Sequence, residues 1–161
     1  MDLAAVVHAL AFVETLLLGL MAGFFYAFSI CVMDALAQRP PAQAVAAMQA
    51  INRVVLNRLF LPVFVGLAPL SLLTAALAFA AWPLRPALWA AAASLLYCAG
   101  TFAVTVVRNV PMNDALARVD TDGADAAARW AGYLSRWMRW NHVRSLSSLA
   151  ALACAAMGLR G

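Results

Sequence analysis

Four long apolar runs limit what this chain can fold into more than any other feature of its sequence. They cover residues 4–33, 59–82, 86–107 and 145–159. The hydrocarbon core of a bilayer is about 30 Å thick, so a helix needs roughly 20 apolar residues to cross it. The fourth run is short, but its helical pattern extends well upstream. We therefore predict an all-α fold, in which residues 1–161 form a single integral membrane domain with four transmembrane helices.

The composition agrees with a membrane protein and argues against a nucleic-acid binder. Charged residues make up 11% of the chain, whereas soluble domains carry about a quarter. All 11 basic residues are arginines, and we interpret the net charge of +4 as a signal of topology. The first apolar run has no basic segment before it and is too long for a signal peptide, so we expect it to remain as a helix.

The arginines are divided unequally between the two sides of the predicted bundle. Arg85 and Arg160 fall on one side. The other nine fall in the two long connections: Arg39, Arg53, Arg58, Arg108, Arg118, Arg129, Arg136, Arg139 and Arg144. Cytoplasmic loops carry an excess of basic residues. We therefore expect a protein of the cell inner membrane with the two long connections in the cytoplasm and both termini on the outer side of that membrane.

Both long connections are predicted to be helical. From Pro41 the first has no helix breaker until Pro62, so we expect its helix to run into the second span. In the second, Asp122 is suited to cap a helix, with Asp125 three residues later and no stop before Gly158. The predicted architecture is a four-helix bundle with helical cytoplasmic extensions.

Small residues recur every four positions along the first span, which is typical of close helix packing. They are Ala11, Thr15, Gly19, Gly23, Ala27, Cys31 and Ala35. Gly19 and Gly23 form a GxxxG pattern, which lets two backbones approach closely. We expect this face to pack within the chain, and a homodimer through Gly19 and Gly23 is the alternative.

Polar side chains gather at the cytoplasmic ends of the predicted spans. We expect Asn109, Asn113, Asn141 and Arg144 to converge on one pocket, because alternating topology brings the end of span three beside the start of span four. Two aromatic residues at helical spacing, Trp137 and Trp140, would form its wall.

Each part of this pocket has a structural alternative. The aromatic stripe can belong to the core or to an interfacial belt. Pro111 is expected to end the preceding helix near Asn109, and Asn109 and Asn113 can then serve only as caps.

The remaining chemical signals are weak. His8 and Glu14 are six positions apart, so they do not share a helix face and are not expected to form a metal pair. Glu14 can be structural or a functional base. The three cysteines lie in apolar stretches, and no common catalytic or phosphate-binding motif is present.

Four segments together resemble the DUF1772 group, also called the anthrone oxygenase-like family of small four-span membrane proteins. They are GLMAGFFYAFSICVMDAL, MQAINRVVLNRLF, NVPMNDAL and RWMRWNHVR. One departure is Asp34, where the family is expected to have proline. The resemblance implies oxygen insertion into anthrones without a metal or flavin, so no cofactor is expected. At matching positions it implies these candidate residues: Asn52, Asn57, Asn109, Asn113, Trp140, Asn141 and Arg144. Adding Trp137 from the aromatic stripe, we predict Asn109, Asn113, Asn141 and Arg144 as catalytic and Asn52, Asn57, Trp137 and Trp140 as substrate-binding residues.

Two hypotheses follow for the function. The first is a cofactor-independent oxygenase whose partners are membrane lipid and a hydrophobic aromatic substrate, anthrone-like or quinol-like. An enolate can react with dioxygen directly, so the protein needs only a base, oxyanion donors and a dry site. The base stays open between His142 and Glu14. The alternative is a non-enzymatic small-molecule binder, transport component or partner-helix scaffold.

Overall fold

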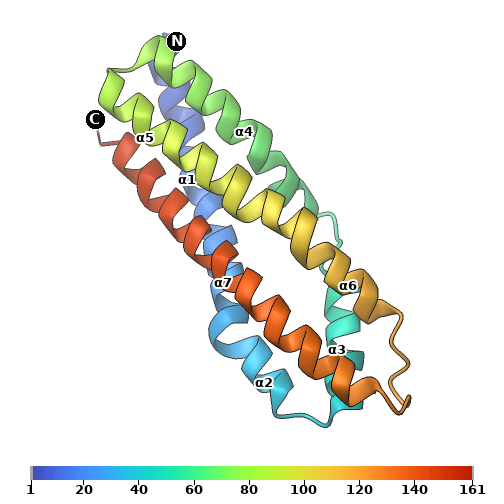
Figure 1. Ribbon diagram of the computed structural model, residues 1–161. Coiled ribbons are helices and arrows are strands. Elements are labelled where there is room, and N and C mark those ends of the chain that lie inside the picture. Colours follow the sequence, from blue (N-terminus) through green and yellow to red (C-terminus); the bar gives the residue numbers. More distant parts are fainter. Residues whose placement is uncertain (1, 161) are drawn as a thin grey trace.

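A computed structural model describes residues 2–160, and all of its regular elements are helical, as predicted. Four long segments run side by side in an elongated bundle (Figure 1). Their bounds are α1 (Leu3–Ala27), η1 (Phe28–Val32) and α2 (Met33–Ala37); α4 (Phe60–Ala81); α5 (Leu84–Leu95), η2 (Leu96–Ala103), η3 (Thr105–Asn109) and α6 (Val110–Ala117); and α7 (Ala126–Gly158). A shorter helix, α3 (Pro41–Val54), packs against α6 and α7.

The surface of the bundle is suited to lipid. Three segments are long and apolar enough to cross a membrane: Leu3–Ala37, Phe60–Ala81 and Leu84–Ala117. Large apolar side chains point outward from them, and Leu20 and Leu95 are 60% and 68% exposed. Such exposure is costly in water and matched to a bilayer. The protein is therefore a membrane protein, and α7 packs between α1 and α5 as the fourth helix of the bundle.

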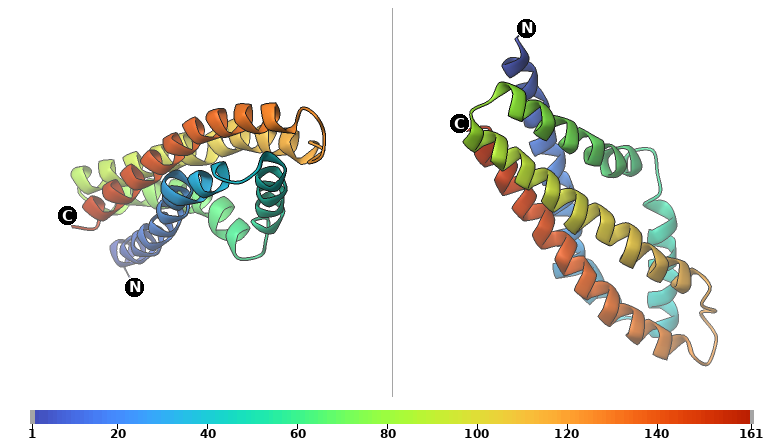
Figure 2. Two further views of the ribbon diagram at one scale, coloured as in Figure 1. Left: turned by 90° about the horizontal axis from the view of Figure 1, so that it is seen from below. Right: turned by 45° about the horizontal axis from the view of Figure 1, so that its top comes forward.

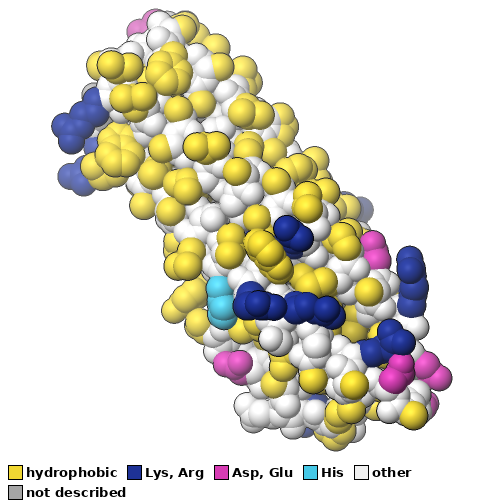
Figure 3. Space-filling model, viewed as in Figure 1, with side chains coloured by type: hydrophobic (Ala, Val, Ile, Leu, Met, Phe, Trp, Pro, Cys, Tyr) yellow, Lys and Arg dark blue, Asp and Glu magenta, His cyan; other side chains and the backbone are white. Residues whose placement is uncertain are grey.

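The two ends of the bundle differ in charge. Both chain termini lie at one end, and α2, α3, α6 and the start of α7 lie at the other (Figures 1 and 2). On the face shown in Figure 3, most arginines gather over this second half, while apolar side chains cover the first. We call the half that contains α2, α3 and α6 the arginine-rich end.

A polar layer separates two apolar parts of the core. On the side of the termini, Leu18, Phe25 and Tyr97 belong to one buried cluster. At the arginine-rich end, Met33 and Trp137 belong to another. The layer between them contains these buried polar residues: Thr101, Asn109, Asn141, Arg144, Ser145 and Ser148.

Three segments of the bundle wind as π-helix, and one of them changes the expected role of Pro111. The Val110 amide bonds to the Thr105 carbonyl five residues earlier, and the helix continues through Pro111 to Ala117. The predicted helix end near Asn109 is therefore wrong. In regular α-helix the proline ring would clash with the carbonyl four residues before it, and the wider turn relieves that clash.

Two other predicted helix ends are also wrong. The helix α3 does not run into α4, because the Asn57 amide group donates to the Val54 carbonyl and accepts from the amides of Leu59 and Phe60. One side chain thus closes α3 and caps the start of α4. The helix α7 begins at Ala126 and not near Asp122, because the amide of Asp122 is held in a turn by the Asp120 carboxylate.

The close approach of two helices occurs at a glycine that the small-residue pattern did not single out. Among the described residues, no heavy atom lies within 4 Å of the position that a Cβ on Gly23 would take, and Gly19 meets only Leu152 at 3.9 Å. The expected close approach of another helix at Gly19 and Gly23 is therefore wrong, whereas Ala11 on the same face is buried. A Cβ on Gly100 would lie 2.5 Å from the Cβ of Ser147, so η2 and α7 touch there.

Candidate functional site

Arg144 is at the centre of the polar layer and is buried, with 4% of its surface exposed. Its Nη2 donates to Asn141 Oδ1 at 2.7 Å, and its Nη1 contacts Thr105 Oγ1 at 3.4 Å. The guanidinium carbon lies 4.5 Å from the ring centre of Phe25 and 4.9 Å from that of Trp137. The cation is thus held by polar atoms at its edge and by two aromatic rings at its faces.

No carboxylate in the described part of the chain balances the charge of Arg144. Across residues 2–160 the one ion pair joins Arg129 to Asp125, at the exposed start of α7. The Nε atom of Arg144 also has no hydrogen-bond partner among these residues. Because a buried charge without a partner is costly, the site is suited to bind an anionic group.

Asn141 fixes the position of Arg144 relative to α1. Its Nδ2 donates to the Phe25 carbonyl at 2.9 Å and to Ser29 Oγ at 2.8 Å, and its Oδ1 accepts from Arg144. Phe25 lies in the last turn of α1, and Ser29 lies in the π-helical turn that follows. Both N–H donors and the oxygen of this amide are used, so the side chain is a rigid link between α1 and α7.

Asn113 is the acceptor for two side chains of α7. Tyr133 Oη and Trp137 Nε1 both donate to Asn113 Oδ1, each at 2.9 Å. Burial raises the pKa of the Tyr133 phenol above its ordinary value, although nearby Asn52 and Arg144 oppose the shift. The phenol therefore stays neutral and remains a donor. Asn109 stands at the N-cap position of α6, but its side chain makes no capping hydrogen bond, and the Asn113 side chain bonds to α7. The capping alternative therefore does not describe these two side chains.

Two more asparagines border the site and have unused hydrogen-bonding atoms. Asn109 is fully buried; its Nδ2 contacts the Trp137 carbonyl at 3.5 Å, and its Oδ1 has no partner within the described chain. Asn52, on α3, lies near Tyr133, and its Nδ2 likewise has no partner in residues 2–160. Buried unpaired polar atoms are rare in native proteins and need an explanation.

The structure brings six of the eight predicted site residues together and places two elsewhere. Asn57 is exposed and bonds only to the backbone around it. Trp140 is half-buried, with the guanidinium of Arg108 at 4.8 Å from its ring. The sequence prediction missed Phe25, Ser29 and Thr105. A serine inside an apolar span was the available signal for Ser29.

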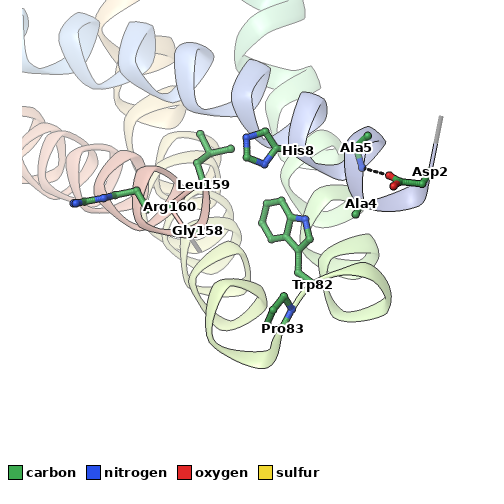
Figure 4. A pocket seen from close by; sticks show the side chains of 9 residues that line it. All are labelled: Asp2, Ala4, Ala5, His8, Trp82, Pro83, Gly158, Leu159 and Arg160. Carbon is green, nitrogen blue, oxygen red and sulfur yellow. Dashed lines mark hydrogen bonds between the residues drawn. The ribbon is translucent and has the colours of Figure 1, made fainter.

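Two cavities lined by residues of the described range 2–160 lie at the other end of the bundle. The larger, of about 550 Å³, is open and is lined by both ends of the chain, with His8 facing Trp82 (Figure 4). Glu14 is also distant from Arg144, because it precedes Phe25 on α1 by 11 residues, about 16 Å of helix. No three of the described His, Cys, Asp and Glu residues lie close enough together to hold a metal ion.

These features define a small helical membrane protein with a buried arginine-asparagine site at one end of its bundle. A family model described as anthrone oxygenase matches residues 56–154, which is more than half of the chain. The protein belongs to this family, and the resemblance inferred from the four segments is confirmed. The comparison with curated proteins and the comparison with solved structures gave no match.

Proposed function

We propose that this protein is a membrane oxygenase that acts, without a bound cofactor, on a hydrophobic aromatic substrate of the anthrone or quinol type. The observation that carries the proposal is the buried Arg144 cation, which has two aromatic rings at its faces and no carboxylate of residues 2–160 paired with it. An extended aromatic enolate has the two properties that match this environment, a delocalised negative charge and a flat apolar body. Membership of the anthrone oxygenase family supports the same class of reaction.

The reaction balances with dioxygen as the only co-reactant. Loss of a proton from the CH2 group of an anthrone gives an enolate, which reduces and then binds dioxygen to form a peroxide anion. Protonation of that anion gives a hydroperoxide. Loss of water from the hydroperoxide, with the second hydrogen of the same carbon, leaves a carbonyl group. Anthrone and dioxygen thus become anthraquinone and water.

In this proposal the residues of the polar layer bind the enolate and keep water out. Arg144 donates to the enolate oxygen, and a donor that strengthens as charge develops lowers the barrier. Asn52 and Asn109 supply further unpaired amide atoms at the border of the site. Trp137 and Phe25 contact the aromatic body, and Asn141 and Asn113 hold Arg144 and Trp137 in position. A substrate of this kind dissolves in the bilayer and reaches the bundle from there.

The test measures oxygen uptake and anthraquinone formation by the protein in lipid nanodiscs supplied with anthrone. We expect turnover by the wild type above the rate of spontaneous oxidation. We expect Arg144→Gln to lower kcat by about 10²–10³-fold, the usual effect of losing one oxyanion donor. Arg144→Lys keeps the charge and should retain more activity and the wild-type melting temperature.

The matched control is Arg136→Gln, because Arg136 lies on the same helix, is exposed and bonds only to the Gly132 carbonyl. This variant should oxidise anthrone at the wild-type rate. If the wild-type protein binds anthrone but forms no anthraquinone, the proposed oxygenase function is wrong, and the alternative function as a small-molecule binder is supported. Equal activity of Arg144→Gln and the wild type would overturn the role of Arg144.

A further inference from the structure

The Ser29 hydroxyl is a junction between the buried site and the surface. It lies 2.8 Å from Asn141 Nδ2, 3.0 Å from Ser145 Oγ and 3.1 Å from His142 Nδ1. Asn141 is fully buried, whereas His142 is exposed. One hydroxyl group therefore connects an exposed imidazole to the amide that holds Arg144.

The protons at this junction can be counted. The Ser145 hydroxyl donates to the Asn141 carbonyl at 2.9 Å, and the Asn141 amide donates to Ser29 Oγ. The single Ser29 proton is then available to either Ser145 Oγ or His142 Nδ1. When Nδ1 of His142 is unprotonated, it accepts from Ser29. When Nδ1 carries a proton, it donates to Ser29, and Ser29 donates to Ser145. The direction of donation by Ser29 thus follows the protonation of His142.

The other candidates for a base are either too distant from this site or already committed as donors. Glu14 is about 16 Å along α1 from Phe25. His8 lines the cavity at the end of the bundle that holds the termini. The phenol of Tyr133 is committed to Asn113 as a donor.

We propose that His142 exchanges the protons of the reaction with the site through the Ser29 hydroxyl. The proposal rests on the oxygenase function proposed above and supplies its missing base. Ser29 Oγ takes the proton from the substrate CH2 group while the Ser29 hydroxyl proton passes to His142 Nδ1. The reverse transfer delivers a proton to the peroxide anion. His142 ends the cycle in its starting state, so no further co-reactant is needed.

The experiment uses the same nanodisc assay with four variants. Proton transfer by a positioned side chain contributes about 10²–10⁴-fold, so we expect His142→Ala to lower kcat by about 100-fold and to leave KM within about twofold. Added imidazole should restore part of the activity of His142→Ala, because it can occupy the space beside Ser29. Ser29→Ala should lose activity equally but show no rescue. Ser29→Thr keeps the hydroxyl and should stay active. The control is His8→Ala, which should match the wild type.

The outcomes separate this proposal from the proposed function. If the wild type is active and His142→Ala is equally active, the proposed proton transfer through His142 and Ser29 is wrong, and the proposed oxygenase function stands. Loss of activity in His142→Ala without rescue by imidazole, accompanied by a lower melting temperature, overturns it in favour of a structural role. A wild type that forms no anthraquinone overturns both.

Discussion

At the scale of single residues, the site is held by amides whose hydrogen bonds are fixed in direction. Asn113 offers one oxygen to two donors, Tyr133 and Trp137. The sequence indicated that asparagines and arginine would gather at one end of the bundle, because residue type and alternating topology are enough for that. It could not indicate which atoms pair. Asn57 and Asn113 are the same residue type in similar settings, yet one caps a helix and the other binds α7.

Replacing Asn113 with Leu should destabilise the protein strongly. The two buried donors would lose their acceptor, and each such loss costs about 1–3 kcal/mol. We therefore expect Asn113→Leu to lower the free energy of unfolding by roughly 2–6 kcal/mol, measured by unfolding in detergent. Asn113→Asp retains an acceptor oxygen and should be milder. The control, Gln43→Leu, changes an exposed amide on α3. Unchanged stability of Asn113→Leu would contradict the pairing with Tyr133 and Trp137.

At the scale of elements, the apolar runs predicted the long helices well, because lipid exposure makes nearly every outward residue apolar. The run at 59–82 corresponds to α4 at Phe60–Ala81. The errors came at places where a local polar contact or a change of winding decided the outcome. The Asn57 side chain separates α3 from α4, and the π-helical turn of η3 carries the chain through Pro111. Neither effect has a strong sequence pattern.

Substitution by alanine is expected to change stability in opposite directions at Gly100, which lies in the contact between η2 and α7, and at Gly23, which lies outside it. Gly100→Ala places a methyl group against Ser147, and overpacking of this kind costs about 1–3 kcal/mol. Gly23→Ala meets open space and gains helix propensity, so its stability should stay level or rise by up to about 1 kcal/mol. Thermal unfolding in detergent measures both. Adding Ser147→Gly to Gly100→Ala should restore stability, and failure of this rescue would show that the contact is not the cause.

At the scale of the whole molecule, the charge asymmetry predicts an orientation. Nine arginines in the connections at the arginine-rich end, against Arg85 and Arg160 at the other, favour a cytoplasmic location for the site. The positive-inside rule is a statistical property of short loops, so the orientation stays a prediction. The homodimer through Gly19 and Gly23 also stays a prediction, and Gly23 is exposed, as such a contact requires.

Cysteine labelling on intact cells tests the orientation. In a background with Cys31, Cys98 and Cys154 replaced by Ala, single cysteines at Gln43 and Asp122 should resist a membrane-impermeant maleimide until the cells are opened. A cysteine at Arg85 should react from outside. Reaction at Gln43 or Asp122 in sealed cells would reverse the orientation.

The π-helical turns beside the site have a consequence for the length of the chain. Each holds one more residue than an α-helical turn, and Ser29, Thr105 and Asn109 all lie within them. Deleting one residue from η3 would let ordinary winding resume and leave the later positions nearly in phase, because it removes the extra residue of the turn. Deleting one residue of α6 before Asn113 would instead turn every position beyond it by about 100° around the axis. Asn113 would then face away from Tyr133 and Trp137, with no side chain altered. The site therefore depends on the number of residues in its helices as well as on their identity, and substitution scanning alone does not detect that dependence.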